Sequence, residues 1–530
     1  MPLYDGFSQW NGPDAACSEG SFRNKGARAV MSRYLVGIDN GGTMSKAAVF
    51  TADGRELASA SRKVEILEPQ PGWSERDMED LWRNTADAVA EAIQKAGVAP
   101  ADIACLACTG HGNGLYLIDA EGRPVRNGIN SMDQRATGII AQWKAEGVDA
   151  QALPKTAQCL WPAQPNALLA WLREHEPLSV KQASAVLMAK DYIRYRLTGN
   201  VRMELTDMSA TSLMNVVTGS YDDSVLRIFG LEEMKRLLPT LVRSADLCGT
   251  VTAAAAALTG LKEGTPVAGG MFDIDACGLA SGSIDERQLV MVAGTWGNNQ
   301  YIARQPLIDK ELFMTSCYSI PGWYLMLEGS PTGAGNLEWF VAEFLGDKQA
   351  LLKQQGGQSV YAWADATVAG LAPRESDPLF LPFLYGSNCG CPAKACVLGL
   401  TSRHTRADVI RAVYEGCVFA HNTHLRRLYA FRPKPDVIRL TGGASRSAVW
   451  VQMFADIFQI PVEVPGGSEL GALGAAIAAA VACGMQPSYE AAVKEMTRVS
   501  RRQEPDPKLR DIYAARYAKY LKAVDRIKDL

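Results

Sequence analysis

The chain has 530 residues, of which 47% are hydrophobic and 21% are charged, a composition typical of a folded globular protein. Lysine and arginine together number 54 and aspartate and glutamate 57, so the formal net charge is -3. This balance, without any long basic run, argues against a nucleic-acid-binding protein and favours a small-molecule substrate.

Several other classes of protein are also excluded. The most apolar stretch, 471–485, is shorter than the ~20 residues that a membrane-spanning helix needs. The polar N-terminus lacks the apolar core of a secretory signal. The 12 scattered cysteines are typical of reduced thiols, so we expect a cytoplasmic protein without a membrane partner. Only five histidines occur, without an HExxH pair, which excludes a histidine-rich metal site.

The N-terminal half alternates strands and helices. Residues 1–32 show no hydrophobic period, and we expect a flexible extension there. Three strands are predicted at 34–39, 46–52 and 55–63, followed by a helix over 78–97. Glu75 and Asp77 precede that helix as acids suited to a helix N-terminus, and Gly97 ends it. A buried strand over 103–110 follows, and this order predicts an α/β fold.

A second half is predicted to begin at residue 264. There 264–273 is expected to form a strand and turn, and 276–282 a helix of small residues. Residues 289–303 then repeat the strand–glycine turn–strand pattern of the N-terminus, which predicts two related lobes with a cleft between them. The expected domains are 33–263, 264–490 and a C-terminal helical segment, 491–530, that packs on the lobes.

Two acidic residues stand where chemistry is expected. Asp39 ends a strand and enters a turn with Gly41 and Gly42, whose backbone N–H groups could approach phosphate while the carboxylate binds hydrated Mg²⁺. A plain hairpin is the alternative, because Asn-Gly is the commonest hairpin signal. Asp273 lies where a strand passes into a helix and could accept a hydroxyl proton, whereas helix capping is assigned mainly to Asp275.

A third segment, 439–447, has a strand, two glycines and then a helix, an arrangement that can bring a nucleotide close to the backbone. The sequence contains no GxxxxGK[ST] motif, which excludes a Walker-type NTPase. The small-residue helix over 471–484 is expected to serve close packing rather than binding.

Together these segments resemble the FGGY carbohydrate kinases of the actin-like ATPase superfamily, over 34–522. Further matches are PGWSERD at 71–77, KDYIRYRLTG at 190–199 and the segment 399–416. Within the family, EGSPTGAGNLEWF at 328–340, FLPFLYGSN at 380–388 and GTWGNN resemble the L-xylulose kinase branch. The resemblance implies two RNase H-like lobes with an active-site cleft, ATP held mainly by the second lobe and sugar mainly by the first.

The resemblance also implies roles for single residues. Asp273 matches the catalytic base and Asp39 the acid associated with Mg²⁺. Sugar-contacting positions are His111, Asp133 and Arg135, together with Asp273. Positions that match the family's phosphate and nucleotide loops are Gly41, Gly42, Thr43, Lys46, Gly294, Thr295, Gly442, Gly443 and Ser447.

The predicted function is therefore an ATP- and Mg²⁺-dependent kinase that phosphorylates a terminal hydroxyl of a small sugar, such as the ketopentose L-xylulose. Residues Gly110 to Asn113 differ from the Arg-Glu pair of glycerol kinases, which disfavours glycerol. Kinases of D-xylulose, ribulose or erythritol remain alternatives, as does a non-catalytic actin-like sensor, although the retention of Asp39 and Asp273 argues against the sensor. The oligomeric state is left open, with a homodimer as one option.

Other reactive side chains are expected to be structural. His404, His421 and His424 lack the spacing of metal ligands, and so do Cys389, Cys391 and Cys396 without a second cluster. Cys105 and Cys108 lie three residues apart on one strand, so their side chains should point to opposite faces. Trp339 and Phe340 suit a helix that faces the core.

Overall fold

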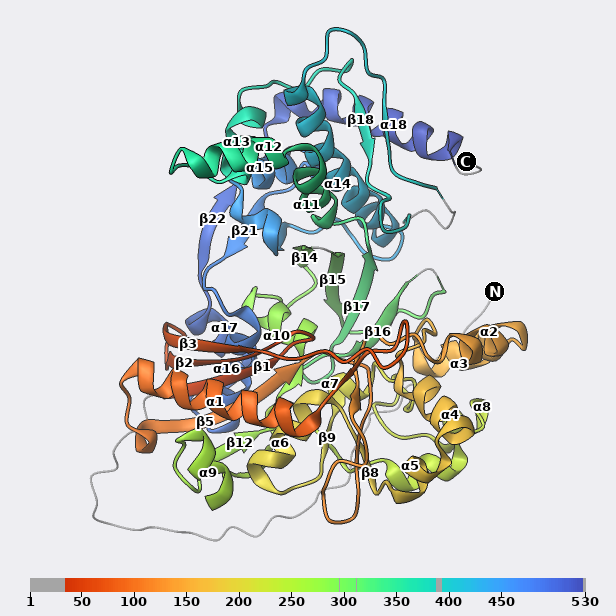
Figure 1. Ribbon diagram of the computed structural model, residues 1–530, viewed down its shortest axis with the longest axis vertical. Coiled ribbons are helices and arrows are strands. Elements are labelled where there is room, and N and C mark those ends of the chain that lie inside the picture. Colours follow the sequence, from red (N-terminus) through yellow and green to blue (C-terminus); the bar gives the residue numbers. More distant parts are fainter. Residues whose placement is uncertain (1–33, 295, 311, 388–392, 528–530) are drawn as a thin grey trace, which may run out of the picture. The chain divides into compact units, whose positions relative to one another are not determined.

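The computed structural model describes residues 34–294, 296–310, 312–387 and 393–527 (Figure 1). The predicted N-terminal extension, Thr295, Cys389 and Cys391 lie outside the described residues. No helix in these ranges has the length and hydropathy that a membrane span requires.

The first lobe is built on a seven-stranded sheet with the order β11-β12-β5-β1-β2-β3, in which β13 also pairs with β5. Its strands are β1 (Tyr34–Asn40), β2 (Met44–Thr51), β3 (Glu56–Lys63), β5 (Ile103–Gly110), β11 (Leu247–Thr250), β12 (Pro266–Ala268) and β13 (Met271–Phe272). Strands β1 and β2 form the predicted antiparallel hairpin, and β5 runs parallel to β1. The four strands predicted at 34–39, 46–52, 55–63 and 103–110 are confirmed as β1, β2, β3 and β5.

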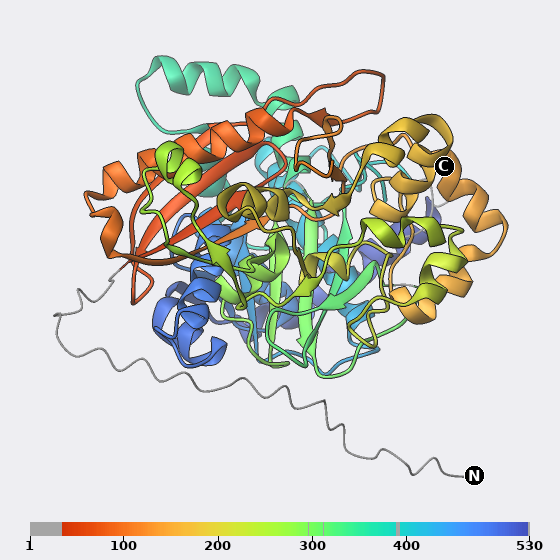
Figure 2. The ribbon, with the colours of Figure 1, turned by 90° about the horizontal axis from the view of Figure 1, so that it is seen from below.

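Helices cover both faces of this sheet. Helix α1 (Met78–Ala96) packs on one face and α16 (Leu470–Ala482) on the other. In Figure 2, α1 (orange) and the blue helices lie on opposite sides of the red strands. Cys105 belongs to the core on the α16 side and Cys108 to the core on the α1 side, so the prediction that they face apart is confirmed.

Helix α1 has the predicted ends. The side chain of Asp77 accepts a hydrogen bond from the Asp80 N–H at 2.9 Å and caps the N-terminus. Gly97 ends the helix in the left-handed conformation, with φ 65°, which glycine adopts without steric cost. Glu75 differs from the prediction, because it lies in strand β4 (Glu75–Arg76) and forms buried ion pairs instead of serving the helix.

A mainly helical part of the first lobe follows β5 and has its own hydrophobic core. Its main elements are β6 (Tyr116–Ile118), β7 (Gly128–Ile129), α2 (Thr137–Ala145), α3 (Val148–Thr156), α4 (Pro165–His175), α5 (Pro177–Gln182), β8 (Ala185–Leu187), β9 (Met203–Glu204), α7 (Leu205–Met208), α8 (Asp223–Ile228) and β10 (Leu241–Val242). Helices α6 (Ala189–Thr198) and α9 (Ala253–Thr259) instead pack beside α1 on the core of the first sheet.

The second lobe carries a seven-stranded sheet with the order β16-β17-β15-β14-β20-β21-β22. Its strands are β14 (Gln288–Ala293), β15 (Gly297–Ala303), β16 (Met314–Cys317), β17 (Tyr324–Ser330), β20 (Val437–Thr441), β21 (Val462–Pro465) and β22 (Val499–Gln503). The β14–β15 hairpin is antiparallel and β20 runs parallel to β14, as β5 does to β1. This shared pattern confirms the predicted repeat of the hairpin in two lobes.

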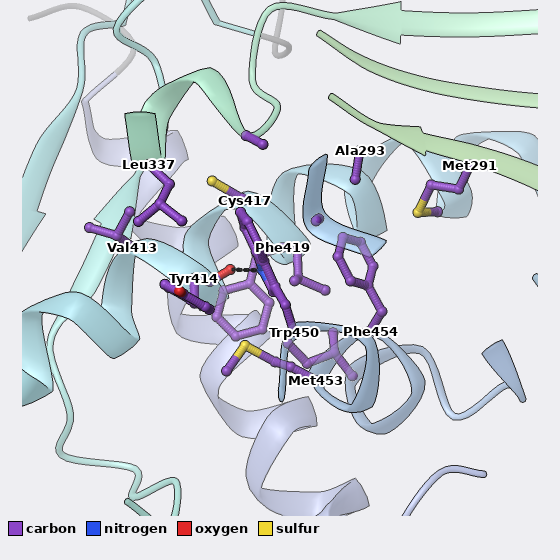
Figure 3. Packing of buried hydrophobic residues seen from close by; sticks show 14 of the residues in the cluster. Met291, Ala293, Leu337, Val413, Tyr414, Cys417, Phe419, Trp450, Met453 and Phe454 are labelled. Atoms are coloured by element: carbon purple, nitrogen blue, oxygen red, sulfur yellow. Dashed lines mark hydrogen bonds between the residues drawn. The ribbon is translucent and has the colours of Figure 1, made fainter. Parts of the chain in front are cut away.

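The second lobe's helices are α11 (Gly335–Phe344), α12 (Gly346–Gln354), α13 (Val360–Ala369), α14 (Arg406–Leu428), α15 (Ala448–Phe458) and α18 (Arg510–Arg526), with a small sheet of β18 (Leu379–Leu381) and β19 (Cys396–Leu398). In the core shown in Figure 3, Trp450 packs against Tyr414 with ring centroids 4.6 Å apart. The Trp450 indole N–H donates to the Tyr414 carbonyl at 3.1 Å. This contact joins α14 to α15.

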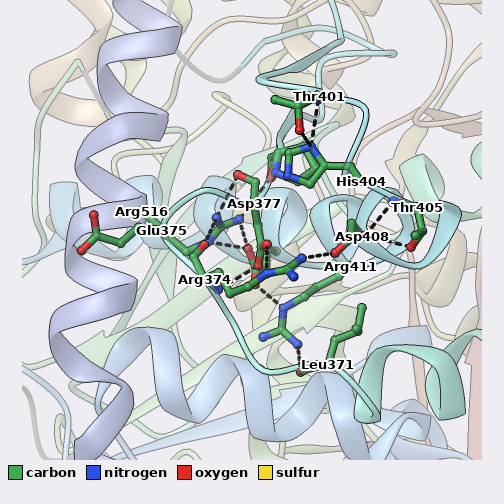
Figure 4. Close-up of polar contacts among 12 residues, drawn as sticks. Leu371, Arg374, Glu375, Asp377, Thr401, His404, Thr405, Asp408, Arg411 and Arg516 are labelled. Atoms are coloured by element: carbon green, nitrogen blue, oxygen red, sulfur yellow. Dashed lines mark hydrogen bonds and ion pairs between the residues drawn. The ribbon is translucent and has the colours of Figure 1, made fainter.

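Buried ion pairs attach the C-terminal helix to this lobe. Arg516 on α18 pairs with Glu415 on α14 and donates to the carbonyl of Asp377 at 3.0 Å. Arg374 pairs with Asp377 and Asp408 in the same region, as Figure 4 shows. The helical segment at the C-terminus therefore packs on the second lobe.

The structure places the start of the second sheet later than the predicted domain boundary at residue 264. Strands β12 and β13 join the first sheet, and α10 (Asp273–Ala280) packs against α16. Helices α16 and α17 (Tyr489–Met496), although late in the sequence, return to the first sheet (Figure 1). The lobe to which each of these segments belongs depends on contacts between residues far apart in the sequence. Local sequence patterns do not reveal such contacts.

The contact between α16 and α10 depends on Gly474. A Cβ at this position would lie 2.2 Å from the carbonyl oxygen of Ala276. We expect Gly474→Ala to destabilise the protein by about 3 kcal/mol or more, because backbone cannot move aside cheaply. Gly138→Ala is the matched control: Gly138 lies exposed in α2 with open space around it, so the change should stabilise by up to ~1 kcal/mol. Equal thermal midpoints for the two variants would contradict this packing.

Candidate active site

The two predicted acids lie at the same edge of the first sheet. Asn40, next to Asp39, pairs with Gly110 on β5, and Gly110 also pairs with Phe272, next to Asp273. Both pairings are parallel, so the carboxyl ends of β1, β5 and β13 meet at one edge. Ligands of α/β proteins bind at such edges. The two carboxylates are close enough that the charge of Asp39 acts on Asp273.

Burial and like charge alter both acids. Burial raises the pKa of Asp273 well above its usual range, and the carboxylates of Asp39 and Asp207 raise it further. Burial raises the pKa of Asp39 to about 6, although the ammonium group of Lys46 opposes the shift. Clustered acids with raised pKa values are typical of catalytic sites.

The glycine turn after Asp39 is braced from one side. The guanidinium of Arg76 donates to the carbonyls of Gly41 at 3.3 Å and Gly42 at 3.2 Å, and the Asn130 amide donates to Gly42 at 3.3 Å. On the other side the turn is open: a Cβ built on Gly42 would have no other atom within 4 Å, and Thr43 is exposed. The turn therefore combines a fixed backbone with an open side.

Lys46 is held by an ion pair. Its ammonium group lies 3.0 Å from the Glu469 carboxylate, just before α16, and Lys46 faces Asp39 in the β1–β2 register. Gly471 in the first turn of α16 lies against Asp39, because a Cβ there would come within 2.5 Å of Asp39 Oδ2. A helix N-terminus favours a neighbouring negative charge. Helix α16 thus contributes to this site, which differs from the predicted packing role alone.

His111 is buried beside the glycine turn and forms hydrogen bonds through both ring nitrogens. Its Nε2 accepts a hydrogen bond from Arg76 at 2.8 Å, since a guanidinium only donates. Its Nδ1 then donates to the Gly112 carbonyl at 3.2 Å. Burial and the charge of Arg76 lower the pKa of His111 to about 3, so the ring is neutral at physiological pH.

Asp133 and Arg135 lie together, also buried. Asp133 accepts hydrogen bonds from the Ser74 N–H at 2.7 Å and from the Arg135 guanidinium at 2.9 Å. Arg135 also pairs with Glu75 at 2.7 Å and lies 4.1 Å from the ring centroid of Trp73. Its Nη1 atom has no hydrogen-bond partner among the described residues. The structure brings these side chains together through the 71–77 segment.

Glu75 and Arg76 are functional candidates that residue-by-residue reasoning missed. The signal for both is the PGWSERD match at 71–77, but the local pattern predicts Glu75 as a helix acid and assigns Arg76 no role. Their two-residue strand β4 pairs with β7, an interaction across more than fifty residues that no local pattern indicates.

Gly294, Gly442 and Gly443 meet in the second lobe. Gly442 has φ 84°, and a Cβ there would lie 2.8 Å from the Gly294 nitrogen, so only glycine permits this approach. Beside them is a cavity of about 440 Å³, lined by Ala334, Leu337, Glu338, Ser359, Tyr361, Ala362, Asp365, Tyr414, Gly443, Arg446, Ser447 and Trp450. Ser447 caps α15 and donates to Asp365 at 2.7 Å. The lining residues Ala334, Leu337 and Glu338 fall within the EGSPTGAGNLEWF match at 328–340, whereas the lining from α13 belongs to no motif in the sequence.

The remaining reactive residues have structural contacts. The prediction that Asp275 caps α10 is wrong, because no side chain caps this helix. The Oδ1 of Asp275 instead accepts hydrogen bonds from the N–H of Ser319 at 3.0 Å and from its hydroxyl at 3.1 Å. His421 and His424 are buried in α14. No group of three metal-ligating side chains occurs within the described ranges.

Comparisons with known proteins agree with this architecture. The N-terminal domain of the FGGY family of carbohydrate kinases matches residues 34–279, and the C-terminal domain matches 289–483. The chain is 37% identical over 499 residues to a probable L-xylulose kinase from Pasteurella multocida, covering 93% of this chain and 99% of the relative.

A second relative, the L-xylulose/3-keto-L-gulonate kinase of Escherichia coli, is 37% identical over 492 residues, or 92% of this chain and 96% of the relative. The crystal structure of xylulose kinase from Rhodospirillum rubrum superposes with a TM-score of 0.83 at 26% identity and covers 93% of this chain and 99% of that structure. The chain thus belongs to the FGGY family of carbohydrate kinases.

Proposed function

We propose that this carbohydrate kinase transfers the γ-phosphoryl group of ATP to a terminal hydroxyl of a ketopentose, with L-xylulose as the leading candidate. The observation that carries the mechanism is that Asp39 and Asp273 lie close together at one edge of the first sheet. The names of the 37% identical relatives support the choice of sugar.

Asp273 is the proposed general base. As the sugar hydroxyl attacks the γ-phosphorus, its proton passes to the Asp273 carboxylate. Because burial and two neighbouring carboxylates raise the pKa of Asp273, it binds that proton more tightly than an isolated aspartate would. Positioning and charge neutralisation supply most of the rate enhancement in phosphoryl transfer, and a base contributes the rest.

Asp39 is the proposed contact to Mg²⁺. Mg²⁺ keeps several waters and is commonly bound in kinases through one or two carboxylates and the substrate phosphates. Asp39 fits this chemistry, since it is a partly accessible carboxylate whose ionised form is compensated only in part by Lys46, which is also paired with Glu469. When bound, Mg²⁺ neutralises phosphate charge. Gly41, Gly42 and Thr43 would lie along the same phosphates.

The sugar is proposed to bind near His111, Asp133 and Arg135. Buried polar atoms usually have partners, so those without one mark places where a ligand can bind. Near this network the Nη1 of Arg135 and the Oδ1 of Asn113 have none among the described residues. They offer the N–H groups of Arg135 Nη1 as donors and the Asn113 oxygen as an acceptor to sugar hydroxyls.

The nucleotide is proposed to bind in the second lobe. The 440 Å³ cavity beside Gly443 and Ser447 has the size and mixed lining of a small-ligand site, and Gly294 adjoins it through Gly442. We assign the base and ribose to this cavity and the phosphates to the two glycine turns, with Lys46 and Thr295 as further candidates at the phosphates.

A coupled assay of ADP release across several sugars tests this proposal. The panel contains L-xylulose, D-xylulose, L-ribulose, D-ribulose, erythritol and 3-keto-L-gulonate. We expect the highest kcat/KM with L-xylulose and little ADP without sugar. A higher kcat/KM for another panel member would replace L-xylulose as the substrate. ADP release at the same rate without sugar would instead favour the sensor.

A further inference from the structure

Five charged side chains form a cluster with no solvent exposure beside the segment that carries Asp273. Lys190 contacts three carboxylates, at 2.9 Å from Asp191, 3.3 Å from Asp207 and 3.4 Å from Glu204. Arg194 pairs with Asp191 at 2.6 Å. Ion pairs this deeply buried gain little stability over apolar packing, because desolvation offsets the attraction. Stability alone therefore does not explain why five charged side chains are buried here.

The cluster is close to electrically balanced at neutral pH. It contains two cations and three carboxyl groups. Burial raises the pKa of the Asp207 carboxyl to about 8, and the nearby carboxylates of Asp191 and Glu204 add to the shift. Two cations therefore face three carboxyl groups, of which burial disfavours the ionisation of one. The cluster thus carries little net charge.

Two members of this cluster hold both ends of the turn that leads to Asp273. Arg194 donates to the carbonyl of Gly269 at 2.5 Å. At the other end, the Phe272 N–H donates to the Thr206 hydroxyl at 2.9 Å, and that hydroxyl donates to the Glu204 carboxylate at 2.7 Å. Phe272 directly precedes Asp273, so a chain of buried hydrogen bonds runs from the cluster to the proposed base.

We propose that Thr206 is a positioning residue for phosphoryl transfer, which fixes the backbone at Phe272 and thereby holds the Asp273 carboxylate in line with the sugar hydroxyl. This role rests on the proposed function of Asp273. Thr206 touches neither reactant; it acts through the Phe272 amide. Its hydroxyl accepts one hydrogen bond from the Phe272 amide and donates one to Glu204, so it ties the Phe272 amide to the ion cluster.

The test compares Thr206→Val with Thr206→Ser by steady-state kinetics. Valine keeps the shape but removes the acceptor for the Phe272 amide, whereas serine keeps it. We expect Thr206→Val to lower kcat by at least ~10-fold with KM for ATP within about 2-fold, since small misplacements of a reacting group can cost up to ~10²-fold. Thr206→Ser should restore kcat to within ~2-fold of the wild type.

Ser209→Ala is the matched structural control. The Ser209 hydroxyl accepts a hydrogen bond from the Cys317 N–H at 2.9 Å and donates to the Thr206 carbonyl at 2.7 Å, so its loss removes bonds of the same kind from the same buried region. It does not hold Phe272. We expect a similar fall in thermal midpoint but an unchanged kcat. If Thr206→Val is too unstable to assay, Thr206→Ala is measured instead, at a fixed interval below each variant's midpoint.

The outcomes separate this inference from the proposed function. Wild-type kcat in Thr206→Val or Thr206→Ala, or an equal loss in Ser209→Ala, overturns the positioning role. Asp273→Asn is assayed in parallel: if it keeps wild-type turnover, the assignment of the base fails and the role of Thr206 fails with it. Loss in Asp273→Asn with full activity in the Thr206 variants refutes the positioning role alone.

Discussion

Asp273→Asn is expected to lower kcat by at least ~10²-fold, the lower range for loss of a general base. Asparagine has nearly the same shape but cannot take the hydroxyl proton. The cavity proposed for the nucleotide lies in the second lobe, and Asp273 does not line it, so the affinity for ATP should stay within about 2-fold. Steady-state ADP release and a fluorescence titration with ATP measure the two quantities.

Thermal unfolding provides the control for folding of this variant. The pKa of Asp273 is raised in the folded state, so ionisation of this carboxyl lowers the stability of the fold. This loss of stability is complete at a pH above the folded-state pKa and absent at a pH below the unfolded-state pKa. Removing the carboxyl should therefore not lower the thermal midpoint at alkaline pH. An inactive variant with a markedly lower midpoint would point to misfolding, and an active one would exclude Asp273 as the base.

Asp39→Asn is expected to weaken activation by Mg²⁺ and to lower kcat/KM for MgATP by about 10²-fold or more, because a charged ligand near the transferred phosphate is lost. In the wild type the Mg²⁺ requirement should rise as the pH falls through about 6, since protonation of Asp39 then competes with the metal. Mg²⁺ titrations of initial rate between pH 5 and 8 measure both effects.

Asp53→Asn is the control for this prediction. Asp53 is an exposed carboxylate in the turn at the far end of β2 from the glycine turn, so its loss should leave the Mg²⁺ requirement unchanged. In Asp39→Asn the requirement should no longer rise between pH 7 and 5. A Mg²⁺ dependence that is the same in the wild type and in Asp39→Asn at each pH would show that Asp39 does not contact the metal.

The sequence predicted those elements whose signals are local. The β1–β2 hairpin, the ends of α1 and the strand–diglycine–helix segment all follow from turn glycines, capping residues and hydrophobic period over a few residues. The position of Asp273 at a strand-to-helix junction is of the same kind. Local rules suffice where one segment determines its own conformation.

The remaining features depend on contacts between distant segments. The pairing of β13 with β5 assigns Asp273 to the first sheet, next to Asp39, whereas the sequence placed the two acids in different lobes. The contacts of Glu75 with Arg126 and Arg135 span more than fifty residues. The role of Gly471 against Asp39 likewise requires α16 to return to the first lobe. Such pairings leave no periodic signal in a single sequence.

Single-turnover measurement of L-xylulose phosphorylation by enzyme loaded with MgATP tests the central claim most directly. Rapid quenching follows sugar phosphate and ADP together in the wild type and in Asp273→Asn. We expect one sugar phosphate for each ADP, with the step slowed at least ~10²-fold in the variant despite full loading. ADP without sugar phosphate, or equal rates in the two proteins, would contradict the account.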